Sequence, residues 1–130
     1  MKNILKLLLC AFTLTFSLAV GAADKPAGAT ELLHVVSFKF KSAATPDQIK
    51  AIEDAFRSLK KTIPQIKSYE WGTNVSPEKH AKGFTHGFIL RFKSEADRNT
   101  YLDHADHKAF GALLGPVLED VFVIDFWAQH

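Results

Sequence analysis

The sequence predicts an α+β fold in which strands and helices follow one another in the order β-α-β-β-α-β. Residues 32–40 and 84–92 alternate in side-chain character as half-buried strands do. Between them, a helix-starting motif at residues 45–48 precedes apolar residues at helical spacing. By the rules that govern chain connections, the simplest arrangement is a ferredoxin-like fold, a four-stranded antiparallel sheet with helices on one face.

The first helix is predicted by its two ends. Thr45 has the hydrogen-bonding side chain of an N-cap, Pro46 suits the first helical position, and Gln48 completes a capping box. Apolar residues then recur at helical spacing at Ile49, Ile52, Phe56 and Leu59. The helix is expected to end near Ile63, because the residue before a proline is pushed out of the helical region.

The remaining elements follow from turn signals and strand-rich runs. Residues 66–73 form a second predicted strand, and a loop over 74–83 leads into the strand at 84–92, so these two strands pair antiparallel. Ser94 is the N-cap of a second helix. A short helical turn and a final strand over 121–127 complete the order.

The sheet face opposite the helices is expected to be apolar as well. Its side chains are predicted to be those of Leu33, Val35, Ile89, Val121, Val123 and Trp127. A second copy of the chain is the simplest cover for such a face, and packing two sheets together gives a homodimer with a barrel at its centre, a dimeric α/β barrel. The alternative is a monomer with one partly apolar face.

The N-terminus has the pattern of a secretory signal peptide over residues 1–23. Lys2 and Lys6 are followed by an apolar run at 7–20 and by small residues at 21–23 that suit cleavage. A retained membrane span is the alternative, but the run is shorter than the about 20 residues that a hydrocarbon core requires. We therefore expect a periplasmic or secreted protein with no membrane association after cleavage.

The chain that follows the signal peptide is expected to contain a flexible lead-in at 24–31 and one domain at 32–130. The single cysteine, Cys10, lies in the signal peptide, so disulfides, thiolate chemistry and a cysteine zinc site are excluded from the mature chain. Lys2 and Lys6 account for the formal net charge of +2, so the mature chain is balanced and nothing indicates nucleic-acid binding.

Polar side chains are concentrated at a few positions that suit acid–base chemistry. Tyr101, His104 and His107 lie within seven residues in a chain that has two tyrosines and six histidines. His34 and His86 interrupt apolar strand patterns. A neutral imidazole with a pKa near ~6.5 can take a proton next to a carbonyl, and a phenol can hydrogen-bond the oxygen that becomes charged. We expect these groups to meet in one cavity, although buried histidines also occur as hydrogen-bonded core residues.

Other polar residues have ordinary explanations. His104 and His107, with Asp103 and Asp106 beside them, have helical metal-ligand spacing, but a single such motif is weak and no metal is predicted. His80 and His130 are expected to be exposed. Four cations could attract an anionic substrate or simply solvate strand ends, namely Lys39, Lys41, Arg91 and Lys93.

Several motifs together resemble the stress-responsive dimeric α/β-barrel family. They are residues 34–40, 69–72, 83–86, 101–111 and 124–126. The resemblance covers the chain from His34 onward, and one characterised member is a plant cyclase that folds a linear polyketide thioester by aldol condensation. It implies that His107 is the general base, that Tyr101 positions or polarises the substrate, and that His34 and His86 line the pocket.

The resemblance also implies a pocket for a hydrophobic or phenolic small molecule, with no cofactor. Its volume is expected to depend on four aromatic residues, Phe38, Phe56, Phe88 and Phe110. The plant cyclase has a tyrosine where this chain has Phe56, so one polar group of the pocket is missing. A coenzyme A thioester does not suit a secreted protein, so the fold transfers better than the reaction.

Two classes of function are open at this point. One is a dimeric enzyme or ligand-binding protein that uses Tyr101 and His107 on a carbonyl or phenolic compound. The other is a non-catalytic stress protein in which the same residues complete the core. Haem binding, known in other dimeric α/β barrels, is a third possibility that no residue specifies.

Overall fold

The computed structural model describes residues 25–129 and confirms the predicted order of strands, with one helix more than expected. The elements are β1 (Leu32–Phe40), α1 (Pro46–Thr62), β2 (Ser68–Thr73), β3 (His86–Phe92), α2 (Glu95–Asp103), α3 (Ala105–Leu114), the short 3-10 helix η1 (Gly115–Val117) and β4 (Leu118–Trp127). The predicted signal peptide lies outside the described residues. No helix within 25–129 has the length and apolar character needed to cross a membrane.

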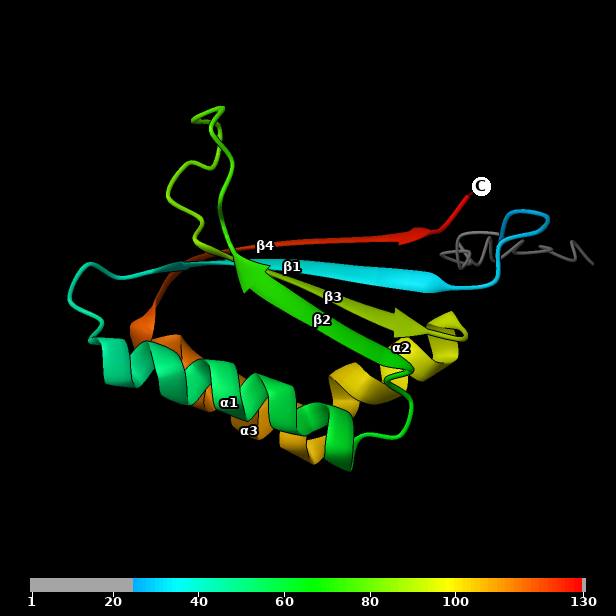
Figure 1. Ribbon diagram of the computed structural model, residues 1–130. Coiled ribbons are helices and arrows are strands. Elements are labelled where there is room, and N and C mark those ends of the chain that lie inside the picture. The colour runs from blue at the N-terminus through cyan, green and yellow to red at the C-terminus, as the bar shows by residue number, and fades with distance from the viewer. Residues whose placement is uncertain (1–24, 130) are drawn as a thin grey trace, which may run out of the picture.

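The sheet is antiparallel throughout and has the strand order β2-β3-β1-β4. All three α-helices lie on one face of this sheet, and the loop between β2 and β3 extends away from the other face (Figure 1). The predicted α+β, ferredoxin-like architecture is therefore confirmed. We refer to the face that carries no helix as the open face.

The beginning and end of α1 follow from the residues that predicted them. The Thr45 side chain accepts a hydrogen bond from the backbone of Gln48, whose side chain accepts one from the backbone of Thr45. Ile63 is extended and closes the helix through its N–H, which donates to the carbonyl of Leu59. Strand β1 also has the predicted bounds.

The segment after α2 differs from the expectation of a short turn. The ten residues Ala105–Leu114 form a full helix, α3, and His104 is both the last cap of α2 and the N-cap of α3. Its Nδ1 accepts a hydrogen bond from the backbone N–H of Asp106 at 3.1 Å. The polar residues around His104 interrupt the helical pattern of apolar residues. Gly111 weakens it further, because glycine disfavours a helix interior.

The face assignment of β4 was wrong. The predicted open-face residues Val121, Val123 and Trp127 lie opposite Phe38, Val36 and Leu32 of β1, which are buried under the helices. The side chains of β4 on the open face are instead Phe122, Ile124 and Phe126. Because β4 is apolar on both faces, its pattern contains no alternation that could decide the register.

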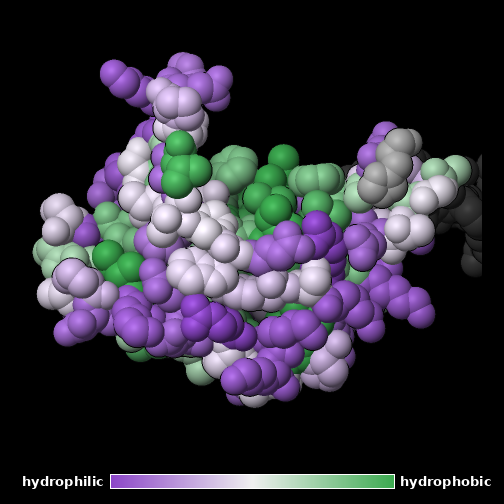
Figure 2. Space-filling view, viewed as in Figure 1, coloured by the Kyte–Doolittle hydropathy of each residue, from purple (hydrophilic) through white to green (hydrophobic). Residues whose placement is uncertain are grey.

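The open face has a broad apolar surface. Phe122, Ile124 and Phe126 are 50%, 46% and 45% exposed, next to the half-buried Leu33, Val35 and Ile89 of the neighbouring strands. Figure 2 shows hydrophobic side chains gathered above the sheet, whereas the side of the molecule occupied by α1 is largely hydrophilic. Contiguous apolar patches of this kind usually mark an interaction surface.

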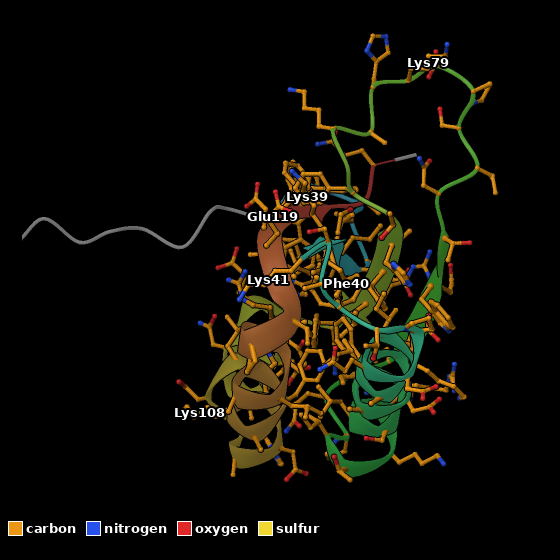
Figure 3. The ribbon with its side chains drawn as sticks, turned by 90° about the vertical axis from the view of Figure 1, so that its left-hand side faces the viewer. Lys39, Phe40, Lys41, Lys79, Lys108 and Glu119 are labelled. Carbon is orange, nitrogen blue, oxygen red and sulfur yellow. The ribbon has the colours of Figure 1, made fainter. Side chains whose placement is uncertain are left out.

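The space between the sheet and the helices is filled by side chains (Figure 3). The core residues are Leu32, Val36, Phe38, Ile52, Phe56, Leu59, Ile63, Ile66, Phe88, Leu90, Phe92, Tyr101, Phe110, Leu114 and Val117. Residues 25–31, the expected flexible lead-in, contain a turn in which the N–H of Ala29 donates to the carbonyl of Pro26. Whether this segment is flexible stays a prediction.

Candidate functional site

Tyr101 lies at the centre of the polar groups on the helix side of the sheet. Its side chain is 1% exposed and extends from α2 toward β1 and α3. Its ring centroid is 5.7 Å from that of His34 and 4.4 Å from that of His107. The structure therefore brings together three of the four residues to which the family resemblance assigned roles in the pocket.

His107 is held in one orientation by a backbone hydrogen bond. Its Nδ1 lies 3.1 Å from the carbonyl oxygen of Leu102, which can only accept, so this nitrogen is the protonated one and Nε2 has the free lone pair. Burial lowers the pKa of His107 below 6.5, partly opposed by the Leu102 hydrogen bond. The neutral imidazole is the form that can accept a proton.

His34 belongs to a buried polar chain that ends at the protein surface. Its Nδ1 donates to a carboxylate oxygen of Asp125 on the neighbouring strand β4 at 2.6 Å. The other oxygen of Asp125 accepts from the guanidinium of Arg98 on α2. With Nδ1 as the donor, Nε2 of His34 carries the ring's lone pair, and the ring meets that of Tyr101 edge to face.

His86 does not join these groups, and the expectation that all the polar residues meet in one cavity is wrong for it. His86 pairs with Phe38 along β1, four positions from His34, which corresponds to roughly 13 Å along a strand. Its Nε2 is 3.1 Å from Glu53 of α1, and its Nδ1 is 2.8 Å from the hydroxyl of Thr85. Both ring nitrogens therefore have partners within the fold.

The four phenylalanines expected around the pocket form a continuous aromatic layer in the core. Phe56 is 5.7 Å from Phe38, 4.6 Å from Phe88 and 4.7 Å from Phe110, measured between ring centroids. All four rings are buried. The rings thus pack against one another, and a ligand in this layer requires at least one of them to move.

A family model for the stress-responsive A/B barrel domain (Dabb) matches residues 32–128 of the chain. The chain belongs to this family. The stress-response A/B barrel domain-containing protein HS1 of Arabidopsis thaliana is 31% identical over 93 residues, which cover 72% of this chain and 85% of that protein. Olivetolic acid cyclase of Cannabis sativa is 27% identical over 93 residues, covering 72% of this chain and 92% of the cyclase.

Solved structures agree with this assignment. Hydroxynitrile lyase from Passiflora edulis superposes with a TM-score of 0.73 at 27% identity, covering 78% of this chain and 95% of the lyase. A dimeric ferredoxin-like protein of unknown function from Thermobifida fusca superposes with a TM-score of 0.66 at 26% identity, covering 78% of this chain and 93% of that chain. This A/B barrel protein is thus related to a cyclase and to a lyase, and has dimeric structural neighbours.

The cations of this A/B barrel protein that were considered for anion binding are mostly engaged by local partners. Lys39 pairs with Glu119 at 2.6 Å, and the two side chains lie together at one end of the sheet (Figure 3). Lys41 donates to the carbonyl of Pro116, and Arg91 pairs with Glu70. These contacts favour the ordinary explanation, in which the cations stabilise strand ends.

Metal binding finds no support in the described part of the domain. Within residues 25–129, no three His, Cys, Asp or Glu side chains are grouped so as to hold a metal ion. His104 instead caps α3, as described above, and its ring lies 3.9 Å from the carboxylate of Asp106. Of the two histidines at helical spacing, His104 therefore has a structural role, and His107 lies in the candidate site.

Two hollows lie outside the aromatic layer of this domain. The larger, of about 730 Å³, is on the open face beside the loop that follows β2. Its floor is exposed backbone, because Gly72 and Gly87 lie side by side on β2 and β3 and have no other atoms near their open sides. The smaller, of about 340 Å³, is a groove between α1 and α3 that is walled in part by Phe110.

Sequence reasoning missed three residues of the site. Asp125 was noted only as part of a family motif, Tyr69 only as part of another such motif and of a strand, and Arg98 was not singled out. The alternation of β2 places Tyr69 on the same face as Trp71, but only the sheet register shows that Tyr69 shares a row with His34 and Asp125. Such cross-strand neighbours are far apart in sequence and leave no local signal.

Proposed function

We propose that this protein is a homodimeric enzyme of the cyclase or lyase type that carries out acid–base chemistry on a small carbonyl compound. The observation that supports this most directly is the contact between Tyr101 and His107, with Nδ1 of His107 committed to Leu102. A fixed neutral base beside a buried phenol is a pair of groups suited to moving a proton in an apolar site. The relationship to olivetolic acid cyclase and hydroxynitrile lyase agrees with this reaction class.

In the proposed reaction, Nε2 of His107 removes a proton from the carbon next to a carbonyl group. The electron pair of that C–H bond moves toward the carbonyl oxygen, and the Tyr101 hydroxyl donates a hydrogen bond to the negative charge that develops there. Burial keeps Tyr101 a neutral donor, because it raises the pKa of the phenol well above its usual range. The protonated His107 then returns the proton to the product.

The homodimer is the partner that the open face fits best. Its exposed side chains Phe122, Ile124 and Phe126 form a ridge along β4. The larger hollow, with Gly72 and Gly87 at its floor, lies on the same face. A two-fold interface places the same surface of each copy in contact, so a ridge and a hollow on one surface can fit each other. The dimeric ferredoxin-like neighbour from Thermobifida fusca supports this arrangement.

The proposed location is the periplasm or the extracellular medium. The basis is the sequence pattern of residues 1–23, with its basic start, apolar run and small residues. N-terminal sequencing of the protein from a secreted or periplasmic fraction tests this, with a mature N-terminus near Asp24 as the expected result. A full-length N-terminus in the cytoplasmic fraction would contradict it.

A non-catalytic, structural role is the second candidate, and the packing of the aromatic layer favours it. Phe38, Phe56, Phe88 and Phe110 are buried against one another, as core residues are. In this alternative, Tyr101 and His107 complete the core and the protein has a purely structural function in stress. The two candidates differ in whether a carbonyl compound exchanges a proton at the site.

Deuterium exchange tests the proposal without knowledge of the natural substrate. The methyl protons next to the carbonyl of para-fluoroacetophenone exchange in heavy water, and proton NMR measures the rate. We expect the wild type to accelerate exchange and His107→Gln to lose about 100-fold or more of that acceleration. His80→Gln, in the exposed loop after β2, is the matched control that keeps full activity. No acceleration by the wild type would favour the structural candidate.

A further inference from the structure

The hydroxyl of Tyr69 is buried and has no hydrogen-bond partner among residues 25–129. Buried polar atoms in native proteins nearly always have partners, so an orphaned hydroxyl needs an explanation. Gln65 and Trp127 each have one further orphaned polar atom. Tyr69 is distinguished from these two because it lies in the sheet row that contains His34.

The sheet register places Tyr69 at the level of the candidate site. Tyr69 of β2 pairs with Leu90 of β3, Leu90 pairs with His34 of β1, and His34 pairs with Asp125 of β4. All four side chains are on the helix side. One strand, β3, lies between Tyr69 and His34, so their backbones are two strand spacings, or roughly 10 Å, apart, a span that a small organic molecule can bridge.

We propose that Tyr69 is a ligand-binding residue of the same site, and that its hydroxyl donates a hydrogen bond to a second oxygen of the molecule held by Tyr101 and His107. This inference rests on the proposed function. It names the ligand class more narrowly, as a small, largely apolar compound that carries two hydrogen-bond-accepting oxygens. One oxygen faces each phenol.

The chemistry of the two phenols supports this ligand class. Burial raises the pKa of Tyr69 and of Tyr101, so both remain protonated donors at physiological pH. A negative charge on Tyr69 would further raise the pKa of Tyr101. Two neutral donors in an apolar layer complement acceptor oxygens and reject a molecule that cannot satisfy both.

The aromatic layer offers a route to Tyr69. The ring of Tyr69 meets Phe56 edge to face at 5.4 Å, and Phe56 stacks on Phe110 at 4.7 Å. Phe110 in turn forms part of the wall of the groove between α1 and α3. In this proposal a ligand displaces the Phe110 ring from the groove and then meets Phe56 and the Tyr69 ring that packs on it. Phe56 has no hydroxyl, whereas Tyr69 presents one.

The test compares two fluorinated probes that differ in the number of acceptor oxygens. para-Fluoroacetophenone has one, and ethyl para-fluorobenzoylacetate has a ketone and an ester carbonyl. Fluorine NMR measures the dissociation constant of each probe for the wild type, Tyr69→Phe and Tyr101→Phe. We expect Tyr69→Phe to weaken the keto ester about 5- to 10-fold and to leave the simple ketone unchanged. Tyr101→Phe should weaken both probes.

Each outcome decides the proposal. Equal affinities of the keto ester for the wild type and Tyr69→Phe would overturn the role of Tyr69, while ketone binding and proton exchange by the wild type would leave the proposed function intact. Failure of the wild type to bind either probe would count against both. Tyr69→Phe is expected to fold with an unchanged or higher melting temperature, because it removes a buried, unpaired hydroxyl.

Discussion

The Nδ1 nitrogen of His34 lies 2.6 Å from Oδ1 of Asp125, its direct neighbour on the adjacent strand. The carboxylate of Asp125 also pairs with Arg98, so one acidic group joins β1, β4 and α2. This arrangement fixes which nitrogen of His34 carries the proton. It also means that the edge strand β4 contributes a residue whose charge is felt at the site.

Replacing Asp125 by alanine is expected to destabilise the protein by about 2 kcal/mol, since it leaves His34 and Arg98 without their shared, largely buried acceptor. Urea unfolding of the purified variant measures this free energy. Asp103→Ala is the control, because Asp103 is exposed and its carboxylate lies 3.9 Å from the exposed ammonium of Lys108, so its loss should cost less than about 0.5 kcal/mol. Equal losses for the two variants would contradict the role given to Asp125.

His107 is expected to make folding stability depend on pH. Its pKa in the folded protein is lowered by burial, whereas in the unfolded chain it is about 6.5. As the pH falls below about 6.5, the unfolded chain binds the proton first, so stability declines until the pH passes the folded pKa, and it is fully present above about 6.5. Urea unfolding between pH 7.5 and pH 5 should show a shallower decline for His107→Gln. An unchanged decline would contradict this assignment.

Ile124→Asp is expected to convert the proposed homodimer to a monomer, because it places a charge in the apolar open face. Sedimentation velocity distinguishes the two states. Leu113→Asp is the matched control, because Leu113 is 50% exposed on α3, away from the open face, and its variant should remain dimeric. A wild type that sediments as a monomer at all concentrations would contradict the proposed homodimer itself.

Gly87→Val is expected to raise the folding stability of the isolated subunit and to lower the affinity of the two subunits for each other. Nothing lies within 4 Å of the position a Cβ would take at Gly87, so valine fits the strand and should stabilise an isolated subunit by about 1 kcal/mol. The same side chain fills the hollow that the second copy is proposed to enter. Urea unfolding in the Ile124→Asp background measures the first effect, and concentration-dependent sedimentation of the single variant measures the second. A dimer of undiminished affinity would show that the hollow is not occupied by the partner.

Local signals were sufficient for the elements that have strong ends or strong alternation. The capping residues around Thr45 and the proline at 64 predicted α1, and β1 was predicted with its observed bounds. Helix α3 was underestimated, because His104 interrupts the pattern and glycine weakens it. The face of β4 was assigned wrongly, because a strand that is apolar on both sides has no periodicity to read.

Local patterns along the chain were enough to predict the order of elements, and with it the ferredoxin-like fold, and to single out Tyr101, His34 and His107 as polar groups among apolar ones. Which of these groups meet depends on how the chain folds in three dimensions. Strand register placed His34 beside Asp125 and in a row with Tyr69, and it directed His86 to Glu53 instead. This follows because local spacing sets secondary structure, whereas pairing between distant strands sets the neighbours of each side chain.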